Sequence, residues 1–418
     1  MGCRARIPLR SVDGISGFAY IMRAAGESQF LFSQMEWLVS SPRPRLILLT
    51  IVVMTLPAFL LASRQTDDSA AVLMPSLSNA LAAAAQPAGD RGYVGREVCG
   101  ECHRENFRLH GASGHASTLA AAAESELAAF FAGKTVDAGP DYGKFQYEVD
   151  QHGLWVRHAA QADGERFLLQ YVLGSGHNAR TLFSLLQDGE GESVGIEHRV
   201  SWFASHQGFG LTPSHADKSP KTPLETFGNP LRDEMMHGCI GCHSTRGTIT
   251  AGKIVDLVPN VNCEKCHGPG ADHVRQARLS KTPPPFSIGR SDWDQESELQ
   301  LCGSCHRLPI NFAPRQLREY PAALARFQPV GMVRSACYLE SEGALKCTTC
   351  HNPHQSAVAK SKADYVADCV QCHHDNAKHQ TICTVSPKDG CIECHLPPLK
   401  FEQGMIFHDH WIRVREQN

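Results

Sequence analysis

The stretch Cys347-Thr-Thr-Cys350-His351-Asn-Pro-His354 contains the pattern that decides the architecture of this chain. Two cysteines two residues apart are followed directly by a histidine, and this Cys-x-x-Cys-His order occurs seven times. The copies are Cys99, Cys102 and His103; Cys239, Cys242 and His243; Cys263, Cys266 and His267; Cys302, Cys305 and His306; Cys347, Cys350 and His351; Cys369, Cys372 and His373; and Cys391, Cys394 and His395. They use 14 of the 17 cysteines, too many and too regular for a disulfide framework in 418 residues.

Structural zinc also uses cysteine pairs at this spacing and is the alternative interpretation. Zinc does not require a histidine immediately after the second cysteine, whereas covalent attachment of haem c does. The two thiols bond to the two vinyl groups of one porphyrin, and the following imidazole becomes the proximal iron ligand. We therefore predict seven covalently attached haems c, with the seven motif histidines as metal ligands.

The overall composition is that of a folding protein, with 42% hydrophobic and 20% charged residues. A formal net charge of −3 argues against nucleic acid as a partner, because phosphate binding needs a strongly basic surface. The partners expected from the haem sites are other redox proteins, including a membrane subunit that oxidises quinol.

Haem c is attached outside the cytoplasm, so the chain needs an export signal. Residues 46–62 form an apolar run whose polar members are Thr50 and Thr55, and Arg43 and Arg45 precede it. Seventeen apolar residues lie between a signal-peptide core and the shortest membrane span, so both a cleaved signal and a retained anchor stay open. Residues 1–92 are predicted to be this leader and its linker, and the haem-bearing part is predicted to be periplasmic.

The motifs are unevenly distributed, with 140 residues between the first two motif starts and six motifs beginning between 239 and 391. The six-motif segment has too little chain for a separate apolar core, so porphyrin faces are expected to form its core. We predict a domain of residues 93–238 with the first haem and a small insert, and a six-haem domain of residues 239–418. The fold class expected is mainly α with much irregular structure, a haem-packed core and a small β-containing insert.

The insert between the first two motifs has strand-like alternation. Apolar and polar residues alternate over 145–149 and 154–157, on either side of Asp150-Gln-His-Gly153, which predicts a β-hairpin. Residues 166–172 predict a third strand, and the Ala-rich segment 116–132 predicts a helix.

Three cysteines lie outside the motifs. Cys3 falls in the predicted leader, which leaves Cys337 and Cys383 in the exported part. A disulfide between them is the first interpretation for an exported protein. Two free thiols, or a cysteine as a distal haem ligand, are the alternatives.

Fifteen histidines remain after the seven motif histidines, enough to give every iron a second axial ligand. His273 and His379 each lie six residues beyond a motif histidine, while His354 and His115 also follow a motif closely. These positions are too near their own motif to cap its haem, so each is expected to bind a neighbouring haem.

In these motifs and the histidines that follow them, the chain resembles the multihaem cytochromes c of the cytochrome c554 type. The resemblance covers residues 93–412. It rests on four stretches: the segment leading from Cys99 to Ser113-Gly-His115; Cys263-Glu-Lys-Cys266-His267-Gly-Pro-Gly with His273; the run ending at His354; and Cys391-Ile-Glu-Cys394-His395-Leu-Pro with Asp409-His410. It implies that His115, His273, His354 and His410 are distal ligands in stacked haem pairs, and that electron transfer is the activity. The Cys-x-x-Cys-Lys site of the related ammonia-forming nitrite reductases is absent from the chain.

For the other haems we select His177, His237 and His379 as distal ligands, with His206, His215 and His408 in reserve. Two strong nitrogen ligands on every iron would favour a carrier of single electrons. The alternative is an oxidoreductase that acts on a small nitrogen or sulfur compound at one open-coordinate haem, with His206, His215 or Arg180 as proton donors. The sequence leaves open whether the chain is an enzyme, with the carrier favoured.

Overall fold

The computed structural model describes residues 92–159, 166–216, 219–279, 288, 293–374, 383–386 and 388–415. Asp90–Asn418 form one compact unit. The predicted leader, including the apolar run 46–62, lies outside the described residues. No helix in the described ranges is long and apolar enough to cross a membrane.

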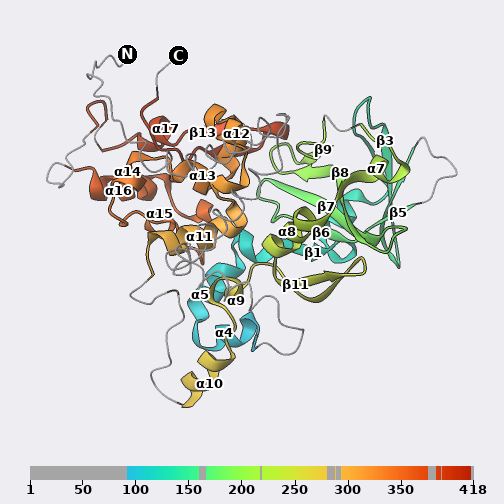
Figure 1. The fold of residues 1–418 in the computed structure, drawn as a ribbon, viewed down its shortest axis with the longest axis horizontal. Coiled ribbons are helices and arrows are strands. Elements are labelled where there is room, and N and C mark those ends of the chain that lie inside the picture. Colours follow the sequence, from blue (N-terminus) through green and yellow to red (C-terminus); the bar gives the residue numbers. More distant parts are fainter. Residues whose placement is uncertain are drawn as a thin grey trace, which may run out of the picture. The chain divides into compact units, whose positions relative to one another are not determined.

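The insert contains more β-structure than the small sheet expected, in two antiparallel sheets. Strands β1, β6, β7, β8 and β10 form one sheet in that order with β9 beside β8, and β2 to β5 form the other. The strands are β1 (Leu119–Ala121), β2 (Thr135–Asp137), β3 (Lys144–Asp150), β4 (Gly153–His158), β5 (Phe167–Leu169), β6 (Tyr171–Leu173), β7 (Ala179–Gln187), β8 (Ser193–Phe203), β9 (Gly208–Leu211) and β10 (Gly228–Leu231). Figure 1 shows β3 to β9 packed together.

The predicted hairpin is confirmed as β3 and β4, which pair from Phe145 opposite His158 to Asp150 opposite Gly153. Phe145 and Tyr147 are buried, while Gln146 between them is exposed, as are Lys144 and Glu148 on either side. This is the alternation that a half-buried strand requires. The predicted third strand is divided, because β5 pairs with β4 whereas β6 pairs with β7 in the other sheet. This segment therefore joins the two sheets.

The predicted helix over 116–132 is wrong. The segment contains two 3₁₀ turns, η1 (Gly114–Ser117) and η2 (Ala122–Glu124), the strand β1, and one short helix, α6 (Glu126–Phe131). Leu119 is buried and its backbone N–H donates to Asn260 Oδ1 at 2.9 Å, while β1 pairs with β6. These tertiary contacts outweigh the helix propensity of alanine.

The insert builds its own apolar core. One cluster includes Phe131, Phe145 and Leu182, and a second includes Phe183 and Ile240. Both clusters lie between residues 119 and 257, so the described residues beyond that point belong to neither. The absence of such a cluster in the described C-terminal residues agrees with the expectation that haem fills the core there.

The rest of the chain consists of short helices joined by irregular segments, and Figure 1 shows α11 to α17 gathered with little sheet among them. The helices are α4 (Arg96–Cys102), α5 (Arg104–Gly111), α7 (Pro223–Phe227), α8 (Asp233–His243), α9 (Cys263–His267), α10 (Ala271–Leu279), α11 (Gln295–His306), α12 (Pro314–Glu319), α13 (Gln328–Met332), α14 (Ala336–Leu339), α15 (Cys347–Cys350), α16 (Lys362–Cys372) and α17 (Cys391–His395). The 3₁₀ turns are η3 (Pro309–Asn311), η4 (Ala322–Arg326), η5 (Ala357–Ala359) and η6 (Glu402–Gly404), and the strand pairs are β11 (Ser244–Thr250) with β12 (Lys253–Pro259) and β13 (Pro398–Lys400) with β14 (Ile406–His408).

Helix α8 crosses the division that we predict between residues 238 and 239. Its residues Met236 and Ile240 are buried in the second apolar cluster of the insert. The second motif, at the end of α8, is therefore anchored in the β-rich part of the chain.

Candidate haem centres

Each of the seven motifs lies at the C-terminal end of a helix: α4, α8, α9, α11, α15, α16 and α17. In every case the histidine is the last residue of the helix or the first residue after it. One helical turn therefore presents both thiols and the imidazole of a motif together, as attachment to one porphyrin requires. The donor set fits haem c at all seven positions.

Four of the motif histidines face a second histidine at a uniform separation. The ring centroids are 6.2 Å apart for His103 and His273, 6.2 Å for His115 and His306, 6.0 Å for His267 and His354, and 6.2 Å for His351 and His410. A nitrogen ligand binds a metal at about 2 Å and the ring centre lies about 1 Å behind it, so two imidazoles on opposite sides of one iron have centres about 6 Å apart. The four pairs have the spacing of axial ligand pairs.

Hydrogen bonds at Nδ1 orient several of these rings. Nδ1 of His243 donates to the Thr118 carbonyl at 3.0 Å, and Nδ1 of His410 donates to the His408 carbonyl at 2.9 Å. Nδ1 of His395 likewise donates to the Arg413 carbonyl at 3.1 Å. A proton held at Nδ1 leaves Nε2 as the lone-pair donor, which is how metal-binding histidines are usually fixed.

The environment of the rings keeps them neutral. Burial lowers the pKa of His410 to about 4, and burial also lowers the pKa values of His115, His243, His306 and His351. Since only neutral imidazole can donate a lone pair to iron, this environment favours ligation at neutral pH.

Two other predicted distal ligands, His177 and His237, are not brought to a motif histidine. His177 is exposed, and His237 is exposed on α8, the same helix as the motif that it precedes. His379 lies outside the described residues. Of the reserves, His215 is bonded through Nε2 to Glu197 at 3.0 Å, His206 is bonded through Nδ1 to Ser205 at 3.0 Å, and His408 donates from Nδ1 to the Leu396 carbonyl at 2.8 Å.

Among the described residues, no second imidazole stacks against His243 or His395. His373 interacts with other groups of the chain. His110 and His198 are buried and use ring nitrogens for structural hydrogen bonds.

The seven motifs are numbered 1 to 7 in chain order, from Cys99 to His395. Their thiols lie next to one another in an order that differs from the chain order. Direct thiol contacts join motif 1 to motif 3, motif 4 to motif 5, and motif 6 to motif 7, through the pairs Cys99 with Cys263, Cys302 with Cys347, and Cys369 with Cys391. Electrostatic interactions join motif 3 to motif 4 and motif 5 to motif 6, through Cys266 with Cys305 and Cys350 with Cys369. The described motifs therefore form one continuous row, 1-3-4-5-6-7.

Motif 2 lies beside this row. Cys242 contacts Cys305, and its thiol also lies 3.8 Å from the Ser304 carbonyl. Cys242 also interacts electrostatically with Lys265, which lies between the two cysteines of motif 3. Motif 2 is thus a branch that meets the row at motif 4.

Two buried carboxylates join neighbouring motifs, and neither was expected from the motif pattern. Glu264, inside motif 3, accepts hydrogen bonds of 2.8–2.9 Å from the backbone N–H groups of Val94, Gly95 and Gly270. It thereby holds the segment that leads into motif 1. Acidic residues inside the motifs at Glu101 and Glu393 are exposed, so residue type alone does not reveal which carboxylate is structural.

The second carboxylate, Glu298, lies on α11 before motif 4. It accepts hydrogen bonds from the N–H of Thr348 at 2.7 Å and from the hydroxyl of Thr348 at 2.9 Å. Thr348 lies between the two cysteines of motif 5. Glu298 therefore connects the helices of motifs 4 and 5.

A third buried carboxylate, Asp409, organises the segment around His410. It accepts hydrogen bonds from the Tyr320 hydroxyl and the Trp411 N–H, both at 2.9 Å, and it pairs with Arg415. Burial by itself raises the pKa of Asp409, but these hydrogen bonds, with that from Arg415 the largest, outweigh burial and the pKa is lowered. Asp409 thus fixes the residue that faces His351.

The predicted disulfide between Cys337 and Cys383 is not formed, because the structure has both residues as free thiols. Cys337 lies within electrostatic range of Cys372, and Cys383 lies within electrostatic range of Cys391. The alternative of two free thiols is the one that the structure holds. Cys3 lies outside the described residues.

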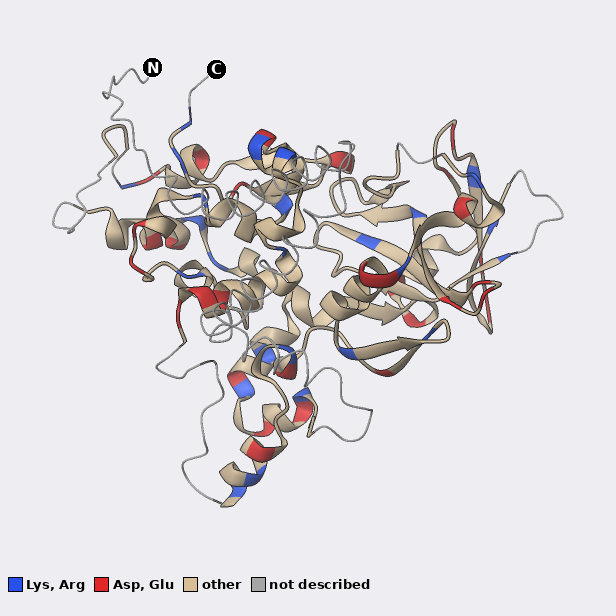
Figure 2. Cartoon of the chain, in the orientation of Figure 1, with Lys and Arg blue, Asp and Glu red and all other residues tan. Residues whose placement is uncertain are grey.

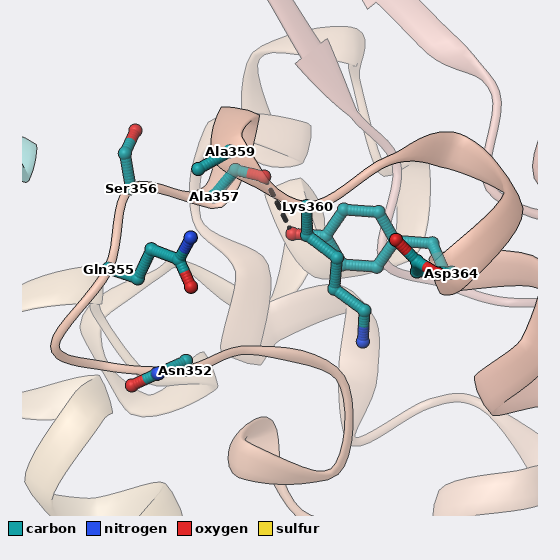
Figure 3. Close-up of a pocket in the computed structure, with 8 residues that line it drawn as sticks. Asn352, Gln355, Ser356, Ala357, Ala359, Lys360 and Asp364 are labelled. Carbon is teal, nitrogen blue, oxygen red and sulfur yellow. Dashed lines mark hydrogen bonds between the residues drawn. The ribbon is translucent and has the colours of Figure 1, made fainter. Parts of the chain in front are cut away.

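A cavity of about 220 Å³ lies beside motif 5, and Figure 3 shows Asn352 and Gln355 on one side of it and Lys360 and Asp364 on the other. Tyr365 also lines it, and the Tyr365 hydroxyl donates to the Ala357 carbonyl at 2.8 Å. The same hydroxyl lies 3.2 Å from Nδ1 of His351, so its oxygen accepts from that ring. Tyr365 therefore supports the proximal imidazole of motif 5.

Replacement of Tyr365 by phenylalanine is expected to raise the reduction potential of the motif 5 haem. An acceptor at Nδ1 increases the electron donation of the imidazole and favours ferric iron, so its loss favours the ferrous state. Spectroelectrochemical titration of the holoprotein measures the change. Tyr171→Phe, in β6, is the matched control, and an unchanged set of potentials in Tyr365→Phe would contradict the role given to Tyr365.

Comparison with known proteins gives three similarities. The family described as "Doubled CXXCH motif" matches residues 341–378, which contain motifs 5 and 6. The dissimilatory sulfite reductase MccA of Wolinella succinogenes is 22% identical over 173 residues, a match that spans 33% of this chain and 22% of that protein. The outer cell wall cytochrome OcwA superposes with a TM-score of 0.41 and 16% identity, over 77% of this chain and 80% of that one.

The family match supports covalently bound haem c at motifs 5 and 6. Motifs 5 and 6 have the doubled form that the family describes, and five further Cys-x-x-Cys-His sequences of the same chain have the same helical placement. The finer likeness to the cytochrome c554 type stays a prediction. The chain is a multihaem c-type cytochrome.

Proposed function

We propose that this chain is a periplasmic cytochrome with seven haems c that carries single electrons between redox partners. The observation that carries the proposal is the set of four imidazole pairs at 6.0–6.2 Å, because an iron with two nitrogen ligands has no free position for a substrate. When bound, the haem supplies reversible one-electron chemistry.

The residues of the chain hold and orient these groups. The four pairs support the proposal that the distal ligands are His273 opposite His103, His115 opposite His306, His354 opposite His267, and His410 opposite His351. In each pair the second histidine lies far from the motif that it faces. The thiol contacts support a row of closely spaced haems, since each thiol marks one edge of its porphyrin.

The periplasmic location and the partners follow from the chemistry of attachment and from charge. Haem c forms outside the cytoplasm, and the apolar run 46–62 supports export, with either a cleaved signal or a retained anchor. Figure 2 shows acidic and basic residues interspersed along the chain. Each haem adds about two propionates, so the holoprotein is more acidic than its formal charge of −3 and favours basic redox partners, such as a quinol-oxidising membrane subunit.

Electron paramagnetic resonance of the fully oxidised holoprotein tests the carrier proposal. The expected spectrum contains low-spin ferric signals from at least the four paired centres, and intact mass is expected to show seven haems. Substitution of His354 by alanine should convert one low-spin centre to high spin, while the exposed His152→Ala should leave the spectrum unchanged. A predominantly high-spin spectrum would contradict the proposal.

A second candidate function is an oxidoreductase that acts on a small nitrogen or sulfur compound. The specific observation in its favour is His243, a motif histidine that no described imidazole faces. The similarity to a protein named as a dissimilatory sulfite reductase adds weak support over a third of the chain. In this candidate the row delivers electrons to motif 2.

A further inference from the structure

The His243 centre differs from the four paired centres in what surrounds it. Thr118 holds the proximal side with two bonds: its carbonyl accepts from His243 Nδ1 at 3.0 Å, and its hydroxyl donates to the His243 carbonyl at 2.9 Å. Helix α8 is anchored through Met236 and Ile240, which are 2% and 1% exposed. The imidazole is therefore held rigidly, although no described histidine is placed opposite it.

Two arginine guanidinium groups lie against one phenylalanine ring in this part of the chain. The guanidinium groups of Arg307 and Arg326 both lie against the Phe327 ring, at 5.4 and 5.1 Å from its centroid. Within the described ranges, neither guanidinium forms a hydrogen bond or ion pair with another residue. Arg307 also lies close enough to Cys239 of motif 2 to interact with it electrostatically.

A hydrogen-bonded pair, His215 and Glu197, lies in the same region. Glu197 accepts a hydrogen bond from His215 Nε2 at 3.0 Å, and the His215 side chain is 1% exposed with Nδ1 lacking a hydrogen-bond partner. Glu197 interacts electrostatically with Cys239, with His243 and with Arg326. The Cys242 thiol lies 3.8 Å from the Ser304 carbonyl, which places motif 2 beside the segment that leads to Arg307. Arg326 also interacts electrostatically with Glu402.

We propose that the open side of the His243 centre binds a small oxyanion of nitrogen or sulfur, held by Arg326 and Arg307. This inference rests on the second candidate function. Guanidinium groups bind oxyanions through directed, charge-assisted hydrogen bonds, although the carboxylates of Glu197 and Glu402 both lie within electrostatic range of Arg326. The hydrogen bond between His215 and Glu197 lies in the same region.

The place of motif 2 in the array agrees with a binding site. The Cys242 thiol of motif 2 meets the row at Cys305 of motif 4 and also interacts electrostatically with Lys265 of motif 3. Electrons that travel along the row do not have to pass through it. A branch of this kind suits a terminal site at which a ligand is held.

The test uses the oxidised holoprotein, with nitrite and sulfite as anionic probes and imidazole as a neutral one. The His243 centre is expected to give a high-spin ferric signal in wild type, and all three probes should convert that signal. Arg326→Gln is expected to weaken nitrite and sulfite binding about tenfold or more, since a hydrogen bond to a charged group contributes about 1.5–3 kcal/mol, while imidazole binding stays unchanged. Arg315→Gln, in an exposed ion pair with Glu319, is the matched control.

The outcomes separate the inference from the function on which it rests. Absence of a high-spin signal in wild type overturns both. A high-spin signal with equal anion affinity in wild type and Arg326→Gln overturns the oxyanion site alone, and it assigns the arginines to haem propionates. If Arg326→Gln does not fold, the exposed Arg307→Gln carries the same comparison, and Arg326→Lys should retain part of the anion affinity.

Discussion

Replacement of Cys302 and Cys305 by alanine is expected to prevent accumulation of folded holoprotein. These two cysteines attach the haem of motif 4, where the row and the motif 2 branch meet through the contacts with Cys347 and Cys242. His306 of the same motif faces His115, which comes from the N-terminal part of the described chain. Loss of one porphyrin at this position removes core contacts from three neighbouring motifs at once.

The physical reason is that the C-terminal part has little apolar core of its own. A loss of more than about 5 kcal/mol exceeds what a marginally stable domain can tolerate. The matched control is Cys391→Ala with Cys394→Ala, at the end of the row, which should give a folded protein with one haem fewer. Haem-stained yield and resistance to trypsin measure the difference. Equal accumulation of the two variants would contradict a junction at motif 4.

Asp409→Ala is expected to release His410 and to create a high-spin centre at motif 5. The Asp409 side chain is 1% exposed, and its removal leaves the Tyr320 hydroxyl and the Arg415 guanidinium without their acceptor. Removal of one partner from a buried ion pair costs about 3–5 kcal/mol. Since His410 is the next residue, the imidazole that faces His351 should lose its fixed position.

The measurement is the spin state of the oxidised protein together with its thermal midpoint. Glu319→Ala removes a carboxylate from an exposed ion pair with Arg315 and should change neither quantity. Asp409→Asn keeps the shape of the side chain and should fall between wild type and Asp409→Ala. A low-spin spectrum identical to wild type in Asp409→Ala would show that His410 is held without this carboxylate.

The features that could be predicted from the sequence are those set by short-range pattern. The Cys-x-x-Cys-His spacing fits one helical turn, and the alternation around Asp150-Gln-His-Gly153 encodes the hairpin directly. The segment 116–132 failed as a helix because burial of Leu119 and pairing of β1 with β6 depend on residues more than 50 positions away. Local propensity contains no information about those partners.

Pairing of the histidines shows the same limit at the candidate site. Spacing indicated that His273 and His354 are too near their own motifs to cap them, but it did not indicate which motif each one faces. That choice depends on how Glu264 and Glu298 hold neighbouring motif helices together. Glu264 lies between motif cysteines, as the exposed Glu101 and Glu393 do, and Glu298 lies outside the motifs, so the network became visible only in three dimensions.

The long separation between paired histidines has a consequence for folding kinetics. His103 and His273, or His115 and His306, are far apart in sequence, so each coordinate bond to iron would close a very large loop, as a long-range disulfide does. Such closures restrict the unfolded chain most when the loop is longest. They also create competition, because an unfolded chain with its porphyrins attached offers many surplus histidines to each iron. Refolding after denaturation should therefore be slowed by exchange of wrongly bound imidazoles, and the insert, which has its own apolar core, should recover first.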